Sequence, residues 1–117
     1  LGSRGLGDVY KRQPEISVIG RKVVAKFKLE QVTSNEVYRI SLFAHSHIDV
    51  SNKLNIVNRT EELNRSITDG EAFELSINLE DYTSTLVPGK SYYFRIGAQS
   101  HGSETKYNYS ASVQLDI

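Results

Sequence analysis

The sequence contains no cysteine, no methionine and no tryptophan. Without cysteine the chain cannot form a disulfide, a thiol nucleophile or a cysteine-ligated zinc site. It also lacks an excess of either charge, because 14 Lys and Arg residues balance 14 Asp and Glu residues. A nucleic-acid-binding face or a polybasic membrane anchor usually shows a basic excess, so neither nucleic acid nor a membrane surface is an expected partner. No apolar run approaches the roughly 20 residues of a membrane span, which argues against direct membrane insertion.

Recognisable motifs of catalysis and cofactor binding are also missing. The chain has no Gly-x-Gly-x-x-Gly run, no P-loop and no Gly-x-Ser-x-Gly nucleophile elbow. We therefore expect no cofactor and no enzymatic activity. At 117 residues the chain has the length of one domain, which is enough to bury a substantial core.

Residues 1–13 differ from the rest of the chain. They contain three of the eight glycines and show no apolar period of two or of 3.6. The run from Gly7 to Gln13 is similar to translated adapter or cloning sequence, and a natural flexible linker is the alternative. We expect residues 1–13 to be a tail that contributes nothing to the core, and residues 14–117 to form the domain.

From Pro14 onward the apolar residues recur at every second position, which predicts strands with one buried and one exposed face. The pattern is clear at residues 22–30, where Val23, Ala25, Phe27 and Leu29 alternate with polar side chains. The expected strands are residues 16–18, 22–30, 37–44, 54–60, 72–79, 91–100 and 107–117. Residues 61–66 could form a short helical turn or an irregular crossover, and Thr33-Ser34-Asn35 and His101-Gly102-Ser103 are expected turns. About seven short strands joined by turns predict an all-β antiparallel sandwich.

The stretch LVPGKSYYFRIGA, residues 86–98, narrows this prediction to one fold. Leu86, Pro88 and Tyr92 have the spacing of a tyrosine corner, in which a buried tyrosine sends its hydroxyl back to the corner backbone. An ordinary strand after a Pro-Gly turn is the alternative. The pattern resembles the E–F corner of fibronectin type III domains. That resemblance implies a seven-stranded, immunoglobulin-like Greek-key sandwich.

A second resemblance covers residues 14–117, and SYYFRIGA (91–98) and KYNYS (106–110) carry it most sharply. The chain is similar to the C-terminal fibronectin-like domain of the domain-of-unknown-function 3823 family. Members of that family resemble surface lipoproteins of Gram-negative bacteria with glycan-uptake loci. The resemblance implies a non-catalytic accessory module at the cell surface or outer membrane, anchored through the parent lipoprotein. Its expected partners are a neighbouring domain of the parent chain or other glycan-uptake surface proteins.

Only weak candidates for chemistry remain. His45, His47 and Asp49 would share one face of an extended segment and could ligate a divalent metal. A solvated loop is the favoured interpretation, because the run follows the end of an expected strand and has no identifiable supporting partners. The adjacent acids Glu61-Glu62 and Glu80-Asp81 lack the separation and burial of a glycosidase pair. We therefore expect no metal site and no catalytic residue.

Three tyrosines are the candidates for contact with a glycan or a partner. Tyr93 is expected on the outward face of its strand, Tyr107 near the start of the last strand, and Tyr82 in the loop before the corner. Exposed rings can stack on sugars, and they can also simply form stabilising cross-strand pairs. The sequence favours the second interpretation. A carbohydrate-binding module that uses Tyr82, Tyr93 and Tyr107 is the alternative function. In contrast, Phe27, Phe73, Phe94 and Tyr109 are expected in the core.

Overall fold

The computed structural model describes residues 8–9, 14–30, 36–101 and 107–117. Within these residues the fold is a β-sandwich whose only helical segment is the short 3₁₀ turn η1 (Leu79–Tyr82). Two of the expected turns, residues 33–35 and the part of the hairpin loop at 102–103, lie outside the described residues. None of the described helices is long and apolar enough to span a membrane.

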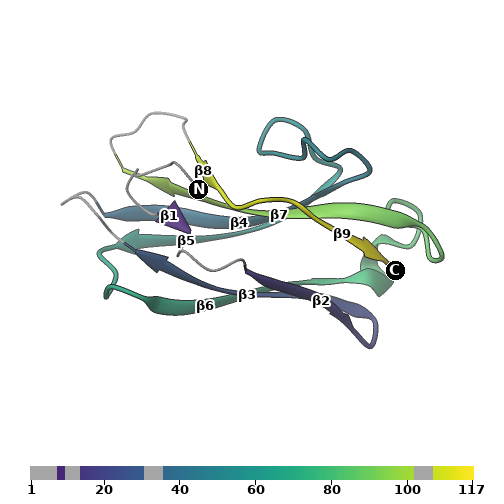
Figure 1. Cartoon of the computed structure of the whole chain (residues 1–117), viewed down its shortest axis with the longest axis horizontal. Helices are drawn as coiled ribbons and strands as arrows, with labels where there is room; N and C mark the ends of the chain where they lie inside the picture. The colour runs from purple at the N-terminus through teal and green to yellow at the C-terminus, as the bar shows by residue number, and fades with distance from the viewer. Residues whose placement is uncertain (1–7, 10–13, 31–35, 102–106) are drawn as a thin grey trace.

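Two antiparallel sheets face each other across the core (Figure 1). One has four strands, with β3 in its centre, β1 and β2 along one edge and β6 on the other. The second has five, in the order β5-β4-β7 with β8 and β9 both paired to the far edge of β7. The strands are β1 (Asp8–Val9), β2 (Glu15–Ile19), β3 (Lys22–Glu30), β4 (Val37–His45), β5 (Val57–Arg65), β6 (Glu71–Asn78), β7 (Ser91–Ser100), β8 (Asn108–Tyr109) and β9 (Val113–Asp116). This is the expected immunoglobulin-like sandwich. It has more than seven strands because one edge of each sheet consists of two short strands, β1 with β2 and β8 with β9.

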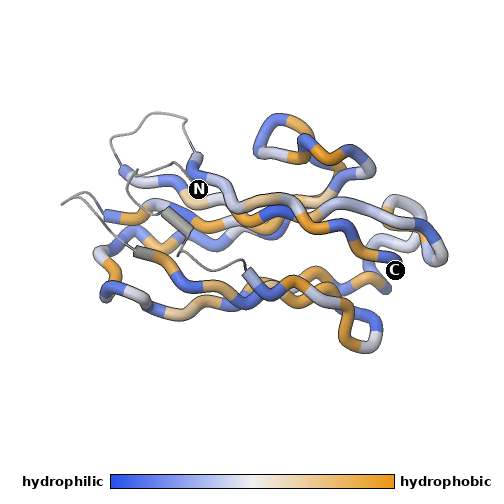
Figure 2. The backbone as a smooth tube through the Cα atoms, in the orientation of Figure 1, coloured by the Kyte–Doolittle hydropathy of each residue, from blue (hydrophilic) through white to orange (hydrophobic). Residues whose placement is uncertain are grey.

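The inward faces of β3, β4 and β7 make most of the core, and β6 adds to it; on β3, β6 and β7 the buried positions follow the alternation that the sequence predicts. Figure 2 shows the hydrophobic positions recurring along these strands. The buried residues on the three strands include Val23, Ala25, Phe27, Leu29, Leu75, Ile77, Tyr92, Phe94, Ile96 and Ala98. Phe73 is half-buried and packs against this core, with its ring stacked on Phe27 at 5.9 Å between centroids.

Strand β4 departs from the expected facing at its start. The sequence alternation predicts that Tyr38 shares the inward face of Ile40. The register shifts between Val37 and Arg39 against both neighbouring strands, and a bulge of this kind reverses the facing of the residues before it. As a result Val37 is buried in the core. Tyr38 instead contacts the ring of His101, with 4.6 Å between ring centroids.

The last expected strand is interrupted, and the interruption moves Tyr109 out of the core. Gly97 pairs with Tyr109, whereas Phe94 pairs with Val113, so the register slips by one residue between β8 and β9. The inward prediction for Val113 holds, but Tyr109 lies on the outer face with Gly97. Ser110 occupies the break. Its hydroxyl accepts a hydrogen bond from the Ile96 N–H at 3.1 Å, which satisfies a buried backbone group.

Strand β5 is longer than the sequence predicts and starts later. Residues 54–56 precede the strand, and residues 61–65, where a helical turn or crossover is expected, continue it. Most of its side chains are exposed because β5 is the edge of its sheet. An edge strand needs no continuous buried face, so its sequence lacks the period of two that identifies the other strands.

Part of the segment set apart as a tail pairs with the fold. Asp8 and Val9 form β1, opposite Glu30 and Leu29 of β3. They continue the edge that β2 covers further along β3. Pairing through backbone hydrogen bonds requires no apolar pattern, so the sequence gives no signal that predicts strand β1. The boundary at residue 14 stays a prediction, and residues 1–7 and 10–13 lie outside the described part of the chain.

An ion pair joins the two sheets at their β5 and β6 edges. Arg65 Nη2 lies 2.7 Å from Glu71 Oε2, and Nη1 donates to Oε1 at 3.1 Å. The hydrogen bonds from the Arg65 guanidinium, together with one from the Thr68 N–H, hold the pKa of Glu71 below its ordinary value. The same contact raises the pKa of Arg65. The paired groups thus connect neighbouring edges of opposite sheets.

Candidate functional site

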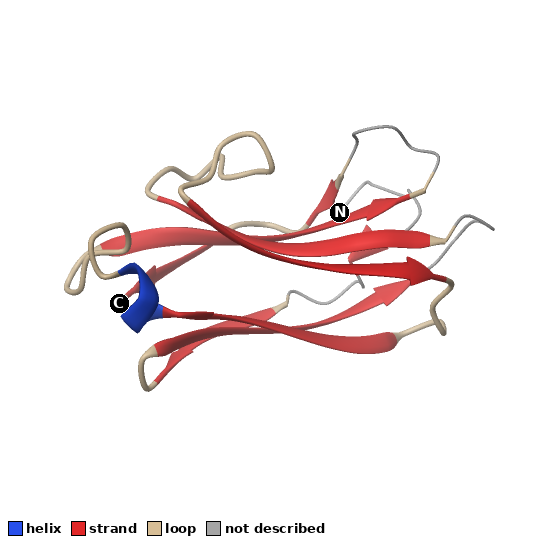
Figure 3. Ribbon diagram, turned by 180° about the vertical axis from the view of Figure 1, so that it is seen from behind, coloured by secondary structure: helices blue, strands red, loops and turns tan. Residues whose placement is uncertain are grey.

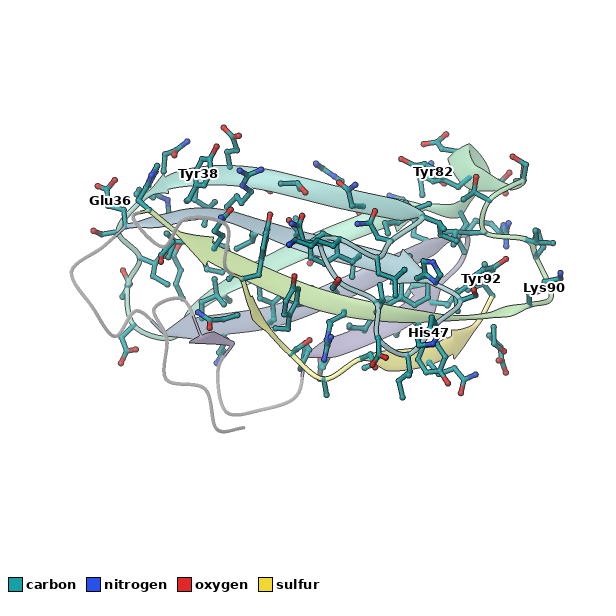
Figure 4. All side chains as sticks on the ribbon, turned by 90° about the horizontal axis from the view of Figure 1, so that it is seen from above. Glu36, Tyr38, His47, Tyr82, Lys90 and Tyr92 are labelled. Carbon is teal, nitrogen blue, oxygen red and sulfur yellow. The ribbon has the colours of Figure 1, made fainter. Side chains whose placement is uncertain are left out.

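The tyrosine corner lies between η1 and β7, at the end of the molecule where Figure 4 labels Tyr92 and Tyr82. Leu86 is fully buried, Pro88 is exposed in the turn, and Tyr92 is 6% exposed. The Tyr92 hydroxyl accepts a hydrogen bond from the Val87 N–H at 3.0 Å. The sequence suggests the same contact with a backbone carbonyl as acceptor, so the roles of donor and acceptor are the reverse of the expected ones. These residues fix the corner.

His45, His47 and Asp49 lie at the end of β4 and in the loop of residues 46–56 that follows it. Each histidine Nδ1 accepts a hydrogen bond from a backbone N–H two residues later, at 3.0 Å for His45 and 3.1 Å for His47. A metal bound through Nδ1 of either ring would have to displace one of these bonds. Within the described residues no group of three His, Cys, Asp or Glu side chains could hold a metal ion.

The two pairs of adjacent acids, Glu61-Glu62 and Glu80-Asp81, lie on different elements and do not form one carboxylate site. Glu61 and Glu62 are exposed on β5, while Glu80 and Asp81 lie in η1. Glu80 Oε2 accepts a hydrogen bond from Arg21 Nε at 3.0 Å. Neighbouring strand residues point to opposite faces of a sheet, so Glu61 and Glu62 cannot share one substrate.

The three candidate tyrosines lie at separate places. Tyr82 is 36% exposed in η1, and Figure 4 shows it at the edge of the molecule. Tyr93 is half-buried on β7, opposite His45 on one side and Gln114 on the other. Tyr107 packs near Gly97, which is the second outward-facing residue after Tyr93 along β7. The three rings therefore do not form one platform.

Tyr107 belongs to an aromatic cluster, Phe43, Tyr107 and Tyr109, on the outer face of the five-stranded sheet. Tyr107 stacks on Tyr109 at 5.7 Å and meets Phe43 edge-on at 5.7 Å. Phe43 is 2% exposed. A Cβ on Gly97 would lie 2.9 Å from the Phe43 ring and 3.1 Å from each tyrosine ring. The cluster is thus a second, smaller hydrophobic core, and its three rings can pack closely over β7 because residue 97 has no side chain.

Arg95 connects this cluster to the loop of residues 46–56. Its guanidinium carbon lies 5.1 Å from the Tyr109 ring centroid. The same group donates to the carbonyls of Ser110 at 2.7 Å and Val50 at 3.1 Å. The Tyr109 hydroxyl accepts from the Asn52 N–H at 3.0 Å. The loop is consequently fixed to the sheet although it projects beyond it.

A shallow, half-open pocket of about 350 Å³ lies beside Tyr82. Its lining residues come from the start of β3, the first third of β5, the end of β6 and η1. Figure 3 shows η1 in blue at the end of β6, at one end of the sandwich. The lining residues besides Tyr82 are Lys22, Arg59, Ser76, Ile77, Asn78 and Asp81.

The sequence singles out Tyr82 as a contact candidate and Asp81 only as part of an acid pair, and it gives no sign of the other lining residues. Lys22, Arg59 and Asp81 come from separate elements, and no local pattern relates them. The aromatic cluster had one available signal, since an isolated glycine inside a strand pattern such as SYYFRIGA often marks a close approach. Gly97 is such a residue. Because Tyr109 is expected in the core, the sequence does not suggest that its ring packs against Gly97 on the outer face.

Comparison with known proteins places this chain in a family. The family described as Domain of unknown function (DUF3823_C) matches residues 11–114. No curated protein matches the chain. A structure described as a "putative carbohydrate binding protein" from Bacteroides uniformis is 26% identical, with a TM-score of 0.81. The match covers 93% of this chain and 56% of that one.

Two further structures share the fold. A DUF3823 family protein from Parabacteroides merdae has a TM-score of 0.74 at 20% identity, covering 90% of this chain and 50% of its own. A DUF3823 family protein from Bacteroides ovatus has a TM-score of 0.73 at 18% identity, covering 90% and 52%. This chain therefore spans about half the length of these relatives. Because the family match extends over nearly all of the sandwich, this chain belongs to the DUF3823_C family of domains of unknown function.

Proposed function

We propose that this domain is a non-catalytic interaction module that docks against the remainder of a longer parent protein. The observation that carries the proposal is the loop of residues 46–56, which displays large aliphatic side chains to solvent. Ile48 is 55% exposed, Ile56 41% and Leu54 38%. Figure 2 shows hydrophobic positions along this loop, which projects from the sandwich.

The loop is held in a defined conformation, which distinguishes it from an ordinary flexible connection. Ser51 and Leu54 exchange backbone hydrogen bonds at 2.9 and 3.2 Å. The Asn55 amide donates to the carbonyls of Ser51 and Asn52, and Val50 is fully buried. A preorganised apolar surface loses little conformational entropy when it is covered, which favours docking.

The remainder of the parent protein is the proposed partner because the solved relatives are almost twice as long as the matched region. Interfaces between domains of one chain commonly bury about 600–1,500 Å². The proposed setting is the surface of a Gram-negative cell, in a lipoprotein of a glycan-uptake system. The relatives from Bacteroides and Parabacteroides support this setting.

Hydrogen exchange tests the docking role. The amides of residues 46–56 should exchange more slowly in the full-length parent protein than in this domain alone, because covering an exposed loop suppresses its local opening. Replacing both Ile48 and Leu54 by Ser should remove that additional protection. Exposed Ile19, which is 58% exposed on β2, provides the matched control as Ile19→Ser. Equal exchange of the loop in the domain and in the parent protein would contradict the proposal.

Carbohydrate binding is the second candidate function. It is favoured by the relative from Bacteroides uniformis that is described as a "putative carbohydrate binding protein". Tyr93 and Tyr107 do not share a platform, so among the described residues the pocket beside Tyr82 is the candidate place for such a function. Retardation of the domain in polysaccharide-containing gels, lost on Tyr82→Ala and kept on Tyr93→Ala, tests this candidate.

A further inference from the structure

The pocket beside Tyr82 lies at the side of the sandwich where edge strands of opposite sheets meet. β5 and β6 are edge strands and contact each other across this opening. Arg65 and Glu71 bridge it at one end. Arg59 lies opposite Leu42 of β4, on the inward face of its sheet, so its side chain is directed toward the opening. The pocket lies toward the other end, where Lys22, Ser76 and Asn78 line it from the outward face of the four-stranded sheet.

Three charged side chains line the pocket: Lys22, Arg59 and Asp81. Over the described residues, neither Lys22 nor Arg59 forms an ion pair, and the Asp81 carboxylate has no ion pair either. Arg59 makes one hydrogen bond, to the carbonyl of Thr60 at 3.3 Å. Two cations and one carboxylate give the lining a formal charge of +1. This charge complements a ligand that carries one negative charge.

The remaining lining has the composition of a sugar site. Tyr82 is a partly exposed ring, and aromatic faces stack on the C–H face of a pyranose. Ser76 and Asn78 supply a hydroxyl and an amide, which can exchange hydrogen bonds with sugar hydroxyls. The volume of about 350 Å³ is at the lower end for small-ligand pockets and matches one or two sugar units.

We propose that this pocket binds a carboxylated sugar unit, such as a uronic acid residue within a glycan. Arg59 and Lys22 bind the carboxylate, since a guanidinium matches carboxylate geometry and an ammonium adds charge. Tyr82 stacks on the ring, and Asp81 accepts hydrogen bonds from hydroxyls while disfavouring a ligand with several negative charges. The inference rests on the second candidate function, carbohydrate binding, and is independent of the docking role.

Titration of the isotope-labelled domain, followed by its backbone amide NMR signals, tests the site. The probes are a trisaccharide of galacturonic acid, a neutral galactose trisaccharide, sodium acetate and a sulfated disaccharide. The acidic trisaccharide should shift signals of residues 22, 59, 76–78 and 81–82. It should bind at least about tenfold more tightly than the neutral and sulfated sugars and than acetate.

Variants separate the ring from the charge. Tyr82→Ala should weaken binding of the acidic trisaccharide about tenfold, while Tyr93→Ala leaves it unchanged. Arg59→Gln should weaken the acidic sugar and not the neutral one. Lys26→Gln is the matched charge control, because Lys26 lies on the exposed face of β3 outside the pocket. It should alter binding by less than about twofold.

Three results would overturn the proposal. Acetate binding as tightly as the sugar would make the pocket a simple anion site. Equal affinity for neutral and acidic trisaccharides would remove the role of Arg59 and Lys22. Shifts confined to other residues would reject this pocket while leaving carbohydrate binding by the domain in place, so the two failures can be told apart.

Discussion

At the residue scale, the corner depends on a single hydroxyl. Replacing Tyr92 by Phe keeps the buried ring but leaves the Val87 N–H without its acceptor. We expect the free energy of unfolding to fall by about 1–3 kcal/mol, the usual cost of an unsatisfied, partly buried donor. Urea unfolding measures it. Tyr93→Phe, at a half-buried position on the outward face, is the control and should change stability by less than about 0.5 kcal/mol. Equal effects of the two substitutions would contradict this role for the corner hydroxyl.

Gly97 is the second residue on which local packing depends. An alanine methyl group there would meet the Phe43 ring at 2.9 Å, and that ring is buried and cannot move away cheaply. Gly97→Ala should therefore lower the unfolding free energy by about 1–3 kcal/mol. Combining it with Phe43→Leu should recover part of the loss, and a double-mutant cycle measures that coupling. Strictly additive effects would show that the predicted clash does not occur.

At the scale of elements, the tie between β5 and β6 gives stability a defined pH dependence. Arg65 lowers the pKa of Glu71 in the folded state. A depressed folded pKa contributes stability above the ordinary glutamate value, and this contribution is lost as pH falls through the folded pKa. The difference in thermal midpoint between the wild type and Glu71→Gln should be largest near neutral pH and shrink as the pH falls below the ordinary glutamate pKa of about 4.3. Glu74→Gln, on the same strand and without an ion pair over the described residues, is the control.

The strands differ in how well the sequence predicts them, and register explains the difference. β3 and β7 are central strands with one inward face, so their alternation identifies both the strand and its buried residues. The bulge after Val37 and the slip between β8 and β9 each insert one residue, which reverses the facing of Tyr38 and Tyr109. The local sequence does not reveal a register shift, because the residues on either side of the shift keep the same alternation whichever way their side chains face.

At the scale of the whole molecule, fold and site were predictable to different extents. The corner motif in residues 86–98 identifies the sandwich because its chemistry lies in one continuous segment. The pocket beside Tyr82 joins Lys22, Arg59 and Asp81 only after two sheets have come together. Nothing in the neighbourhood of any one of these residues signals the others. The sequence therefore singles out Tyr82 as a contact candidate and Asp81 only as part of an acid pair, and it does not reveal the pocket that they share.

Removal of residues 1–13 tests how much of the molecule the domain needs. In the described part of this segment only Asp8 and Val9 pair with the sheet, through two register positions on β3. Deleting the segment should therefore lower the thermal midpoint by no more than about 2 °C. Differential scanning calorimetry of the shortened and full chains provides the comparison. A decrease several times larger would mean that β1 belongs to the cooperative unit.

The short strands have a further consequence for how copies of this domain behave when they are crowded together. An uninterrupted edge is a template on which another chain can add a strand, the first step of aggregation. Here the edge along β7 is broken between β8 and β9, and β5 carries Arg59, Glu61, Glu62 and Arg65 along its exposed length. Breaks and charges both oppose strand addition. The irregularities that obscure the fold in the sequence thus protect neighbouring molecules from pairing with one another.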